Sequence, residues 1–133
     1  MLSCEKESIH IDKENTFNIP FTSSLNEHVV IQNELSRIFV QVKNISDNRC
    51  QDHLNCSDPG EASVRIEVSN ISNSKAETLL HLGSVNYEYQ DSDSVTLNLD
   101  GRLYSVYLTG VNPHPMLESN EIQTAEILVK LKN

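Results

Sequence analysis

The chain has 133 residues, enough for one domain with a sizeable apolar core. It carries 10 basic and 19 acidic residues, for a formal net charge of -9. This balance argues against a nucleic-acid partner, because proteins that bind a phosphate backbone concentrate Lys and Arg. Apolar residues make up 38% and charged residues 22%, which is typical of a globular chain and not of a disordered one. No run of about 18 apolar residues is present, so the sequence predicts no membrane-spanning helix.

The stretch 1–16 differs in composition from the rest of the chain. Charged side chains crowd residues 5–14 and surround two apolar residues, Ile9 and Ile11. A stretch so short and polar has too little apolar surface to offset the entropy of ordering it. We therefore expect an N-terminal lipoprotein tether at residues 1–16 and a β-sandwich domain at residues 17–133.

From residue 17 onward, apolar and polar residues alternate with the period of a β-strand. In the clearest segment Val64, Ile66 and Val68 share one face, and charged residues occupy the other face. The expected strands are residues 29–31, 35–42, 62–68, 78–82, 85–89, 95–99, 103–108 and 124–131.

Polar turns separate these short strands, and Asp100-Gly101 is a strong signal for a two-residue β-hairpin turn. No window of about 11 residues shows a helical stripe of apolar residues. The pattern predicts an all-β fold, an Ig-like (immunoglobulin-like) antiparallel β-sandwich of about seven or eight strands. We expect a core that contains Ile38, Val40, Val64, Ile66, Val68, Leu97, Leu99, Val106, Ile127 and Val129.

Two cysteines, Cys50 and Cys56, stand close together between expected strands. A disulfide between them would close a small ring that contributes about 2 kcal/mol in the chain-entropy model. Disulfides persist in the periplasm and outside cells but are rare in the cytosol. The alternative is a metal site with His53, which lies between the cysteines, but structural zinc needs a further ligand and usually a shorter cysteine spacing. We therefore predict a disulfide and no metal site.

The segment around these cysteines resembles one found in a group of small, uncharacterised bacterial lipoproteins that are common in Bacteroidetes. The shared residues are Arg49, Cys50, Cys56, Gly60, Ala62 and Val64. Segments 103–108 and 111–115 resemble a later strand and a Pro-x-Pro turn of the same group, so that the likeness extends by pattern over roughly residues 27–131. The resemblance implies an all-β fold and an extracytoplasmic location, and it supplies no activity.

The third cysteine, Cys4, follows the small residue Ser3 and precedes the charged stretch. This is the arrangement at the cleavage site of a bacterial lipoprotein. An odd cysteine in an exported protein needs an explanation, and a cysteine that carries two acyl chains gives stable membrane anchoring. We expect lipid attachment at Cys4; the alternative is a free thiol.

Residues able to act in catalysis or bind metals form no recognised motif. His114 and Met116 make a His-x-Met pair of soft copper ligands, but the one other methionine is Met1, and a stiff, proline-bounded turn between two strands is the favoured explanation of the pair. The chain has no nucleophile elbow, metalloprotease motif or phosphate loop. We therefore expect no catalytic residues, no bound metal and no cofactor, so that the chain is not an enzyme.

Together these features predict a non-catalytic binding or interaction module. We expect it to be membrane-anchored, for example at the outer membrane, and to face the periplasm or the cell exterior. The expected partner is an unknown protein or carbohydrate. Two alternatives remain open: a protease inhibitor, because chagasin-like inhibitors use loops of such a fold, and a periplasmic metal-handling protein that uses His114, Met116 and a further histidine.

Overall fold

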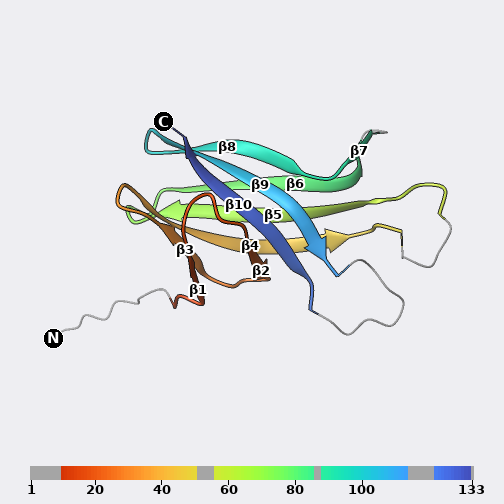
Figure 1. The fold of residues 1–133 in the computed structure, drawn as a ribbon, viewed down its shortest axis with the longest axis horizontal. Helices are drawn as coiled ribbons and strands as arrows, with labels where there is room; N and C mark the ends of the chain where they lie inside the picture. The colour runs from red at the N-terminus through yellow and green to blue at the C-terminus, as the bar shows by residue number, and fades with distance from the viewer. Residues whose placement is uncertain (1–9, 51–55, 86–87, 114–121, 133) are drawn as a thin grey trace.

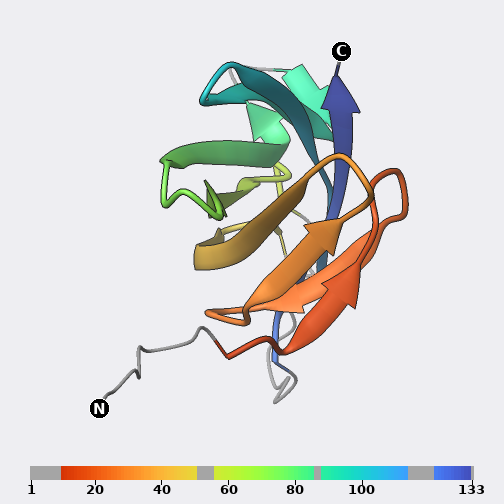
Figure 2. The same cartoon turned by 90° about the vertical axis from the view of Figure 1, so that its left-hand side faces the viewer.

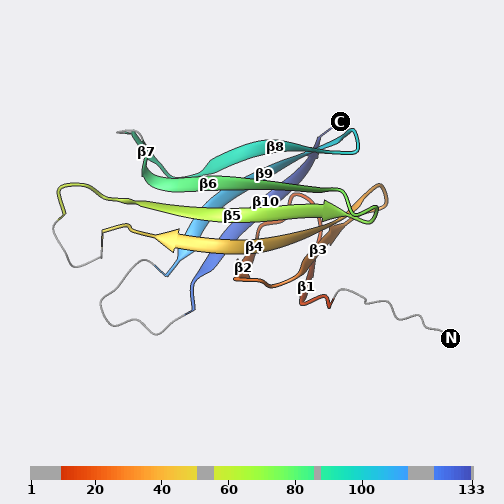
Figure 3. The same cartoon turned by 180° about the vertical axis from the view of Figure 1, so that it is seen from behind.

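The computed structural model describes residues 10–50, 56–85, 88–113 and 122–132. These residues form ten β-strands in two sheets that lie face to face as two layers (Figure 1). From behind, the larger sheet lies in front of the smaller one (Figure 3). The prediction of an all-β sandwich is therefore confirmed.

The larger sheet has six strands in the order β1-β3-β4-β5-β6-β7. From β3 to β7 the strands follow one another in chain order and pair antiparallel, whereas β1 pairs with β3 in parallel. Their bounds are β1 Lys13–Asn15, β3 Val29–Gln32, β4 Arg37–Asp47, β5 Glu61–Asn70, β6 Lys75–Val85 and β7 Glu88–Gln90.

The smaller sheet has four strands in the order β2-β10-β9-β8, all antiparallel. The register shifts between Glu126 and Ile127 of β10, which pair with Gly110 and Leu108, so Thr109 is the extra residue of a β-bulge in β9. The bounds are β2 Phe21–Ser24, β8 Asp93–Leu99, β9 Arg102–Asn112 and β10 Thr124–Lys132.

The core lies between the two layers and is built from the apolar faces of the strands. In β5, Ala62, Val64, Ile66 and Val68 are fully buried, while the residues between them are partly or fully exposed. Successive side chains of a strand point to opposite faces, so this alternation fixes which face packs inward. The expected core residues are all buried: Ile38, Val40, Val64, Ile66, Val68, Leu97, Leu99, Val106, Ile127 and Val129.

The sequence prediction missed the short strands. β1 and β2 have three and four residues, too few for alternation to be recognised. The expected strand at residues 85–89 is wrong, because Val85 ends β6 and pairs with Glu88 at the start of β7.

Strand β1 lies inside the stretch that we expected to be a tether. It pairs with β3, and directly before it Asp12 N donates to His28 O at 2.8 Å while the Asp12 carboxylate accepts the His28 N–H at 2.9 Å. The polar composition of this stretch therefore did not prevent it from pairing at the edge of the sheet, since main-chain hydrogen bonds need no apolar side chains. Residues 1–9 lie outside the described part of the chain.

Ile66→Ala should lower the free energy of unfolding by about 2–5 kcal/mol, because it removes carbon atoms from a fully buried site. Ile71→Ala is the matched control, since Ile71 is 73% exposed, and it should change stability by less than about 0.5 kcal/mol. Urea denaturation at constant m value measures both effects. Equal losses in the two variants would contradict the assignment of Ile66 to the core.

Candidate functional site

Three turns lie at one end of the sandwich, the end that faces the viewer in Figure 2. They join β3 to β4, β5 to β6 and β8 to β9, and therefore come from both sheets. We call the space that they border the turn cleft; its volume is about 440 Å³. It is lined by Asn33, Glu34, Leu35, Ser36, Arg37, Asn70, Ile71, Ser72, Leu99, Asp100, Arg102 and Tyr104.

Asn33 shapes the turn between β3 and β4. Its Oδ1 atom accepts the backbone N–H groups of Leu35 at 2.8 Å and Ser36 at 2.9 Å, and its own N–H donates to the Ser36 carbonyl at 2.9 Å. This is the local hydrogen bonding by which Asn favours turns. Leu35 is thereby held at the tip of the turn with 68% of its surface exposed.

Asn70 plays the same part in the turn between β5 and β6. Its Oδ1 atom accepts the N–H groups of Ser72 at 3.0 Å and Ser74 at 2.9 Å. Asn73 occupies the left-handed region with φ 69°, which Asn tolerates better than most residues. Ile71 lies at the start of this turn and is 73% exposed.

The turn between β8 and β9 has the geometry that Asp-Gly predicts. Asp100 and Gly101 have φ values of 56° and 87°, both positive, as a type I′ hairpin turn requires. Leu99 and Arg102 pair on either side of it. The Asn98 side chain accepts the Gly101 N–H at 2.7 Å and fixes the turn further.

Side chains at the turn cleft also join the two sheets. Tyr104 Oη lies 2.5 Å from Ser36 Oγ, and the Asp100 carboxylate accepts hydrogen bonds from Asn70 Nδ2 at 2.9 Å and Ser74 Oγ at 2.8 Å. The hydrogen bond from Asn70, and then that from Ser74, holds the pKa of the Asp100 carboxyl below its usual value. Asp100 is therefore ionised at neutral pH, the state in which it accepts these hydrogen bonds.

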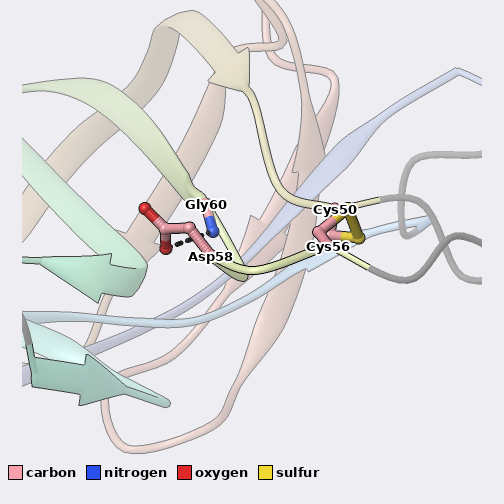
Figure 4. The surroundings of a disulfide bond; sticks show 4 residues. All are labelled: Cys50, Cys56, Asp58 and Gly60. Atoms are coloured by element: carbon pink, nitrogen blue, oxygen red, sulfur yellow. Dashed lines mark hydrogen bonds between the residues drawn. A yellow bond between two sulfur atoms is a disulfide. The ribbon is translucent and has the colours of Figure 1, made fainter.

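At the opposite end of the sandwich, Cys50 and Cys56 form the predicted disulfide, with their Cα atoms 6.1 Å apart (Figure 4). The chain below the ring pairs as a stem, because Cys50 N donates to Pro59 O at 2.6 Å. His53, the third ligand of the alternative metal site, lies outside the described residues. Sulfur atoms joined in a disulfide do not offer the thiolates that metal binding needs.

A buried ion pair anchors this stem to the sandwich. Arg49 Nε and a terminal guanidinium nitrogen donate to the Asp47 carboxylate at 2.8 and 2.7 Å, and the two side chains are 12% and 4% exposed. The same guanidinium nitrogen donates to the Val111 carbonyl of β9 at 2.7 Å, and Gln123 Nε2 donates to Asp47 at 2.7 Å. In the sequence, Arg49 was indicated only by the resemblance and Asp47 was not predicted, although the two residues stand two positions apart and can share one face of an extended segment.

Two glycines let the backbone segments at this end approach closely. Gly60 and Gly83 have φ values of 78° and 95°. A Cβ atom on Gly60 would lie 2.2 Å from the Asn48 carbonyl oxygen, and one on Gly83 would lie 2.4 Å from the Gly60 carbonyl oxygen. Asp58 accepts the Gly60 N–H at 3.1 Å and holds the turn before β5, as the dashed line in Figure 4 marks.

Two histidines lie beside carboxylates on the surface of the larger sheet. His81 Nδ1 is 2.9 Å from Glu61 Oε2, and His28 Nδ1 is 3.8 Å from Asp12 Oδ2. Within the described residues, neither imidazole is hydrogen-bonded to a hydroxyl or a thiol. In each pair the carboxylate can therefore orient the histidine, but within the described residues the histidine activates no nucleophile.

The remaining predicted sites and the comparisons with known proteins identify no further functional residue among the described ones. Cys4, His114 and Met116 lie outside the described residues. In the described ranges, no three His, Cys, Asp or Glu side chains are placed to hold a metal ion, and no helix is long and apolar enough to cross a membrane. No protein-family model, curated protein or solved structure matches the chain.

Gly60→Ala should destabilise the protein more than Gly101→Ala. Both residues have positive φ, so each variant carries a backbone cost of about 1–3 kcal/mol. A Cβ atom at Gly101 meets nothing within 4 Å, whereas one at Gly60 overlaps a backbone carbonyl, so only Gly60→Ala adds a clash. Thermal unfolding followed by circular dichroism compares the two. Equal Tm values would show that the stem does not need the close approach at Gly60.

Proposed function

We propose that the chain is a non-catalytic binding module that contacts a protein partner through the turn cleft. The observation that carries this proposal is the pair of exposed aliphatic side chains, Leu35 and Ile71, which are 68% and 73% exposed beside the same cleft. Singly exposed apolar residues need no explanation. Two exposed apolar residues on hydrogen-bonded turns beside one cleft, however, are typical of the apolar centre of a protein interface.

The chemistry of the lining favours a protein over a carbohydrate. Arg37 and Arg102 line the cleft, and arginine is enriched at protein interfaces and among their energetically dominant residues. Sugar rings commonly stack on exposed aromatic rings, but Tyr104, the aromatic residue of the lining, is 2% exposed. The protease-inhibitor alternative is the special case in which the partner is a protease.

The position of the cleft also supports a binding role. Ig-like sandwiches cluster their recognition loops at one end of the two sheets. We propose that the turns at this end of the sandwich are used in the same way. The opposite end, with its disulfide, ion pair and close glycine contacts, would then serve to hold the scaffold.

We further propose that the module is a lipoprotein of the periplasm or cell surface, anchored through Cys4. The disulfide supports this location, because such bonds persist in oxidising compartments. The resemblance to small bacterial lipoproteins points the same way. A domain of net charge -9 has no attraction to anionic lipid, so a covalent lipid is the means by which it would stay at a membrane.

The cleft proposal predicts that Leu35→Asp with Ile71→Asp abolishes partner binding. A matched control is Tyr89→Asp with Ile122→Asp, which alters residues 66% and 77% exposed elsewhere and changes the net charge equally. Peptides selected from a phage-displayed library on the 133-residue chain should bind the control normally and the cleft variant at least about tenfold more weakly, a difference of about 1.4 kcal/mol. Peptides that bind both variants equally would contradict the proposal, as would a glycan array that yields ligands when the peptide library yields none.

The anchor proposal predicts that Cys4→Ser releases the protein from membranes when it is expressed from its complete gene. Two acyl chains contribute about 0.8 kcal/mol per buried CH₂ group, and the variant loses both. Membrane fractionation and intact mass measure the outcome. A serine variant that stays with the membrane, or a wild-type protein that is soluble and unlipidated, would overturn the assignment of Cys4.

A further inference from the structure

Strand β8 is the longest of the four outermost strands of the described fold, and residues 75–82 of β6, beyond its pairing with β7, form a further open edge. β8 forms one edge of the smaller sheet and has seven residues. β2 at the other edge of that sheet has four, and β1 and β7 at the edges of the larger sheet have three each. Short edge strands are one way in which proteins avoid pairing with other chains.

Side chains cover open backbone groups elsewhere in the fold. On β2, Lys13 Nζ donates to the Thr22 carbonyl at 2.5 Å. On β6, beside the short strand β7, the backbone N–H of His81 donates to Asp93 at 2.9 Å, and its carbonyl accepts from Gln90 at 3.0 Å. These contacts occupy groups that an added strand would otherwise use.

The edge of β8 lacks such protection over most of its length. Leu99 and Arg102 flank the type I′ turn and form a hydrogen-bonded pair across the hairpin. The residues of β8 that alternate with Leu99 therefore direct their backbone N–H and C=O groups away from β9. These residues are Ser94, Thr96 and Asn98. The Ser94 N–H is occupied by the Asp93 carboxylate at 2.9 Å. β8 contains no proline, lysine or bulge, and its one charged residue is Asp93 at its start.

We propose that β8 pairs antiparallel with β8 of a second copy of this chain, about a two-fold axis at Thr96. In this register Ser94 lies opposite the second copy's Asn98, and Val95 lies opposite its Leu97. Val95 is partly buried against the core, and the facing leucine would cover it further. Asp93 faces the second copy's Leu99, so no like charges oppose each other.

The strand is therefore complementary to itself, and the dimer should be weak. The pairing would form about four backbone hydrogen bonds, since the Ser94 N–H of each copy is already occupied, and it would join the two smaller sheets into one. A seven-residue edge buries less than the roughly 1,200 Å² of the smallest stable interfaces, the size range of weak and transient complexes, so we expect micromolar or weaker affinity. Because each copy carries a net charge of -9, the dimer should strengthen as salt screens the repulsion.

Sedimentation velocity tests the proposal on the 133-residue chain carrying Cys4→Ser, which removes a competing intermolecular disulfide. The sedimentation coefficient should rise between roughly 10 μM and 1 mM protein, more so at high salt. Thr96→Lys should abolish this rise, because it places two lysines opposite each other on the axis. Thr22→Lys makes the same charge change at another exposed threonine of the smaller sheet and should leave the dimer intact.

Thr96→Cys gives a positive test in the same background. Directly opposed residues of a hydrogen-bonded antiparallel pair have Cα atoms about 5.5 Å apart, within the range that a disulfide spans. Mild oxidation should convert this variant, but not Thr22→Cys, to a covalent dimer. A chain that stays monomeric at 1 mM without cross-linking at Thr96 overturns the proposal, as does a dimer that Thr96→Lys leaves unchanged. These outcomes do not depend on the turn cleft, because Thr96 is not among the residues that line it.

Discussion

The burial of two apolar sheet faces against each other is the interaction on which the rest of the fold depends. It supplies the main favourable free energy of folding, because each Å² of apolar surface removed from water stabilises the folded state by about 25 cal/mol. That force is non-directional and proportional to area. Val64, Ile66 and Val106 are buried completely, yet their burial alone does not determine how one sheet is aligned on the other. A directional interaction must supply that alignment.

Polar contacts at both ends of the sandwich determine how one sheet is aligned on the other. At one end Arg49 reaches from the stem beyond β4 to the Val111 carbonyl of β9, while Asp47 holds the guanidinium in place. At the other end Ser36 contacts Tyr104, and Asp100 accepts from Asn70. Each contact joins the two sheets and has strict distance and angle requirements. The turn cleft depends on them, since its lining comes from both sheets and keeps its shape only while the sheets stay aligned.

The features predictable from sequence are those with a local cause. Alternation located the long strands, Asp100-Gly101 located a hairpin, and the spacing of Cys50 and Cys56 indicated a disulfide. The contacts that align the two sheets are not local, because Arg49 and Val111 stand 62 positions apart and Ser36 and Tyr104 stand 68 apart. No periodic pattern relates such positions. Strand β1 was missed for another reason: backbone hydrogen bonds hold it, and these leave little trace in side-chain composition.

The residues that carry the lipoprotein resemblance have structural explanations in this fold. Arg49 forms the buried ion pair, Gly60 allows two backbone segments to approach, and Ala62 is fully buried between the sheets. A motif made of such residues preserves a scaffold, and many partners could use the same scaffold. Recognition must then come from residues whose identity the fold does not require. Leu35 and Ile71 are such residues, since hydrogen bonds of Asn33 and Asn70 fix their turns while both side chains remain exposed. The exposure of these two side chains on fixed turns is the structural reason for which we propose that the partner binds at the turn cleft.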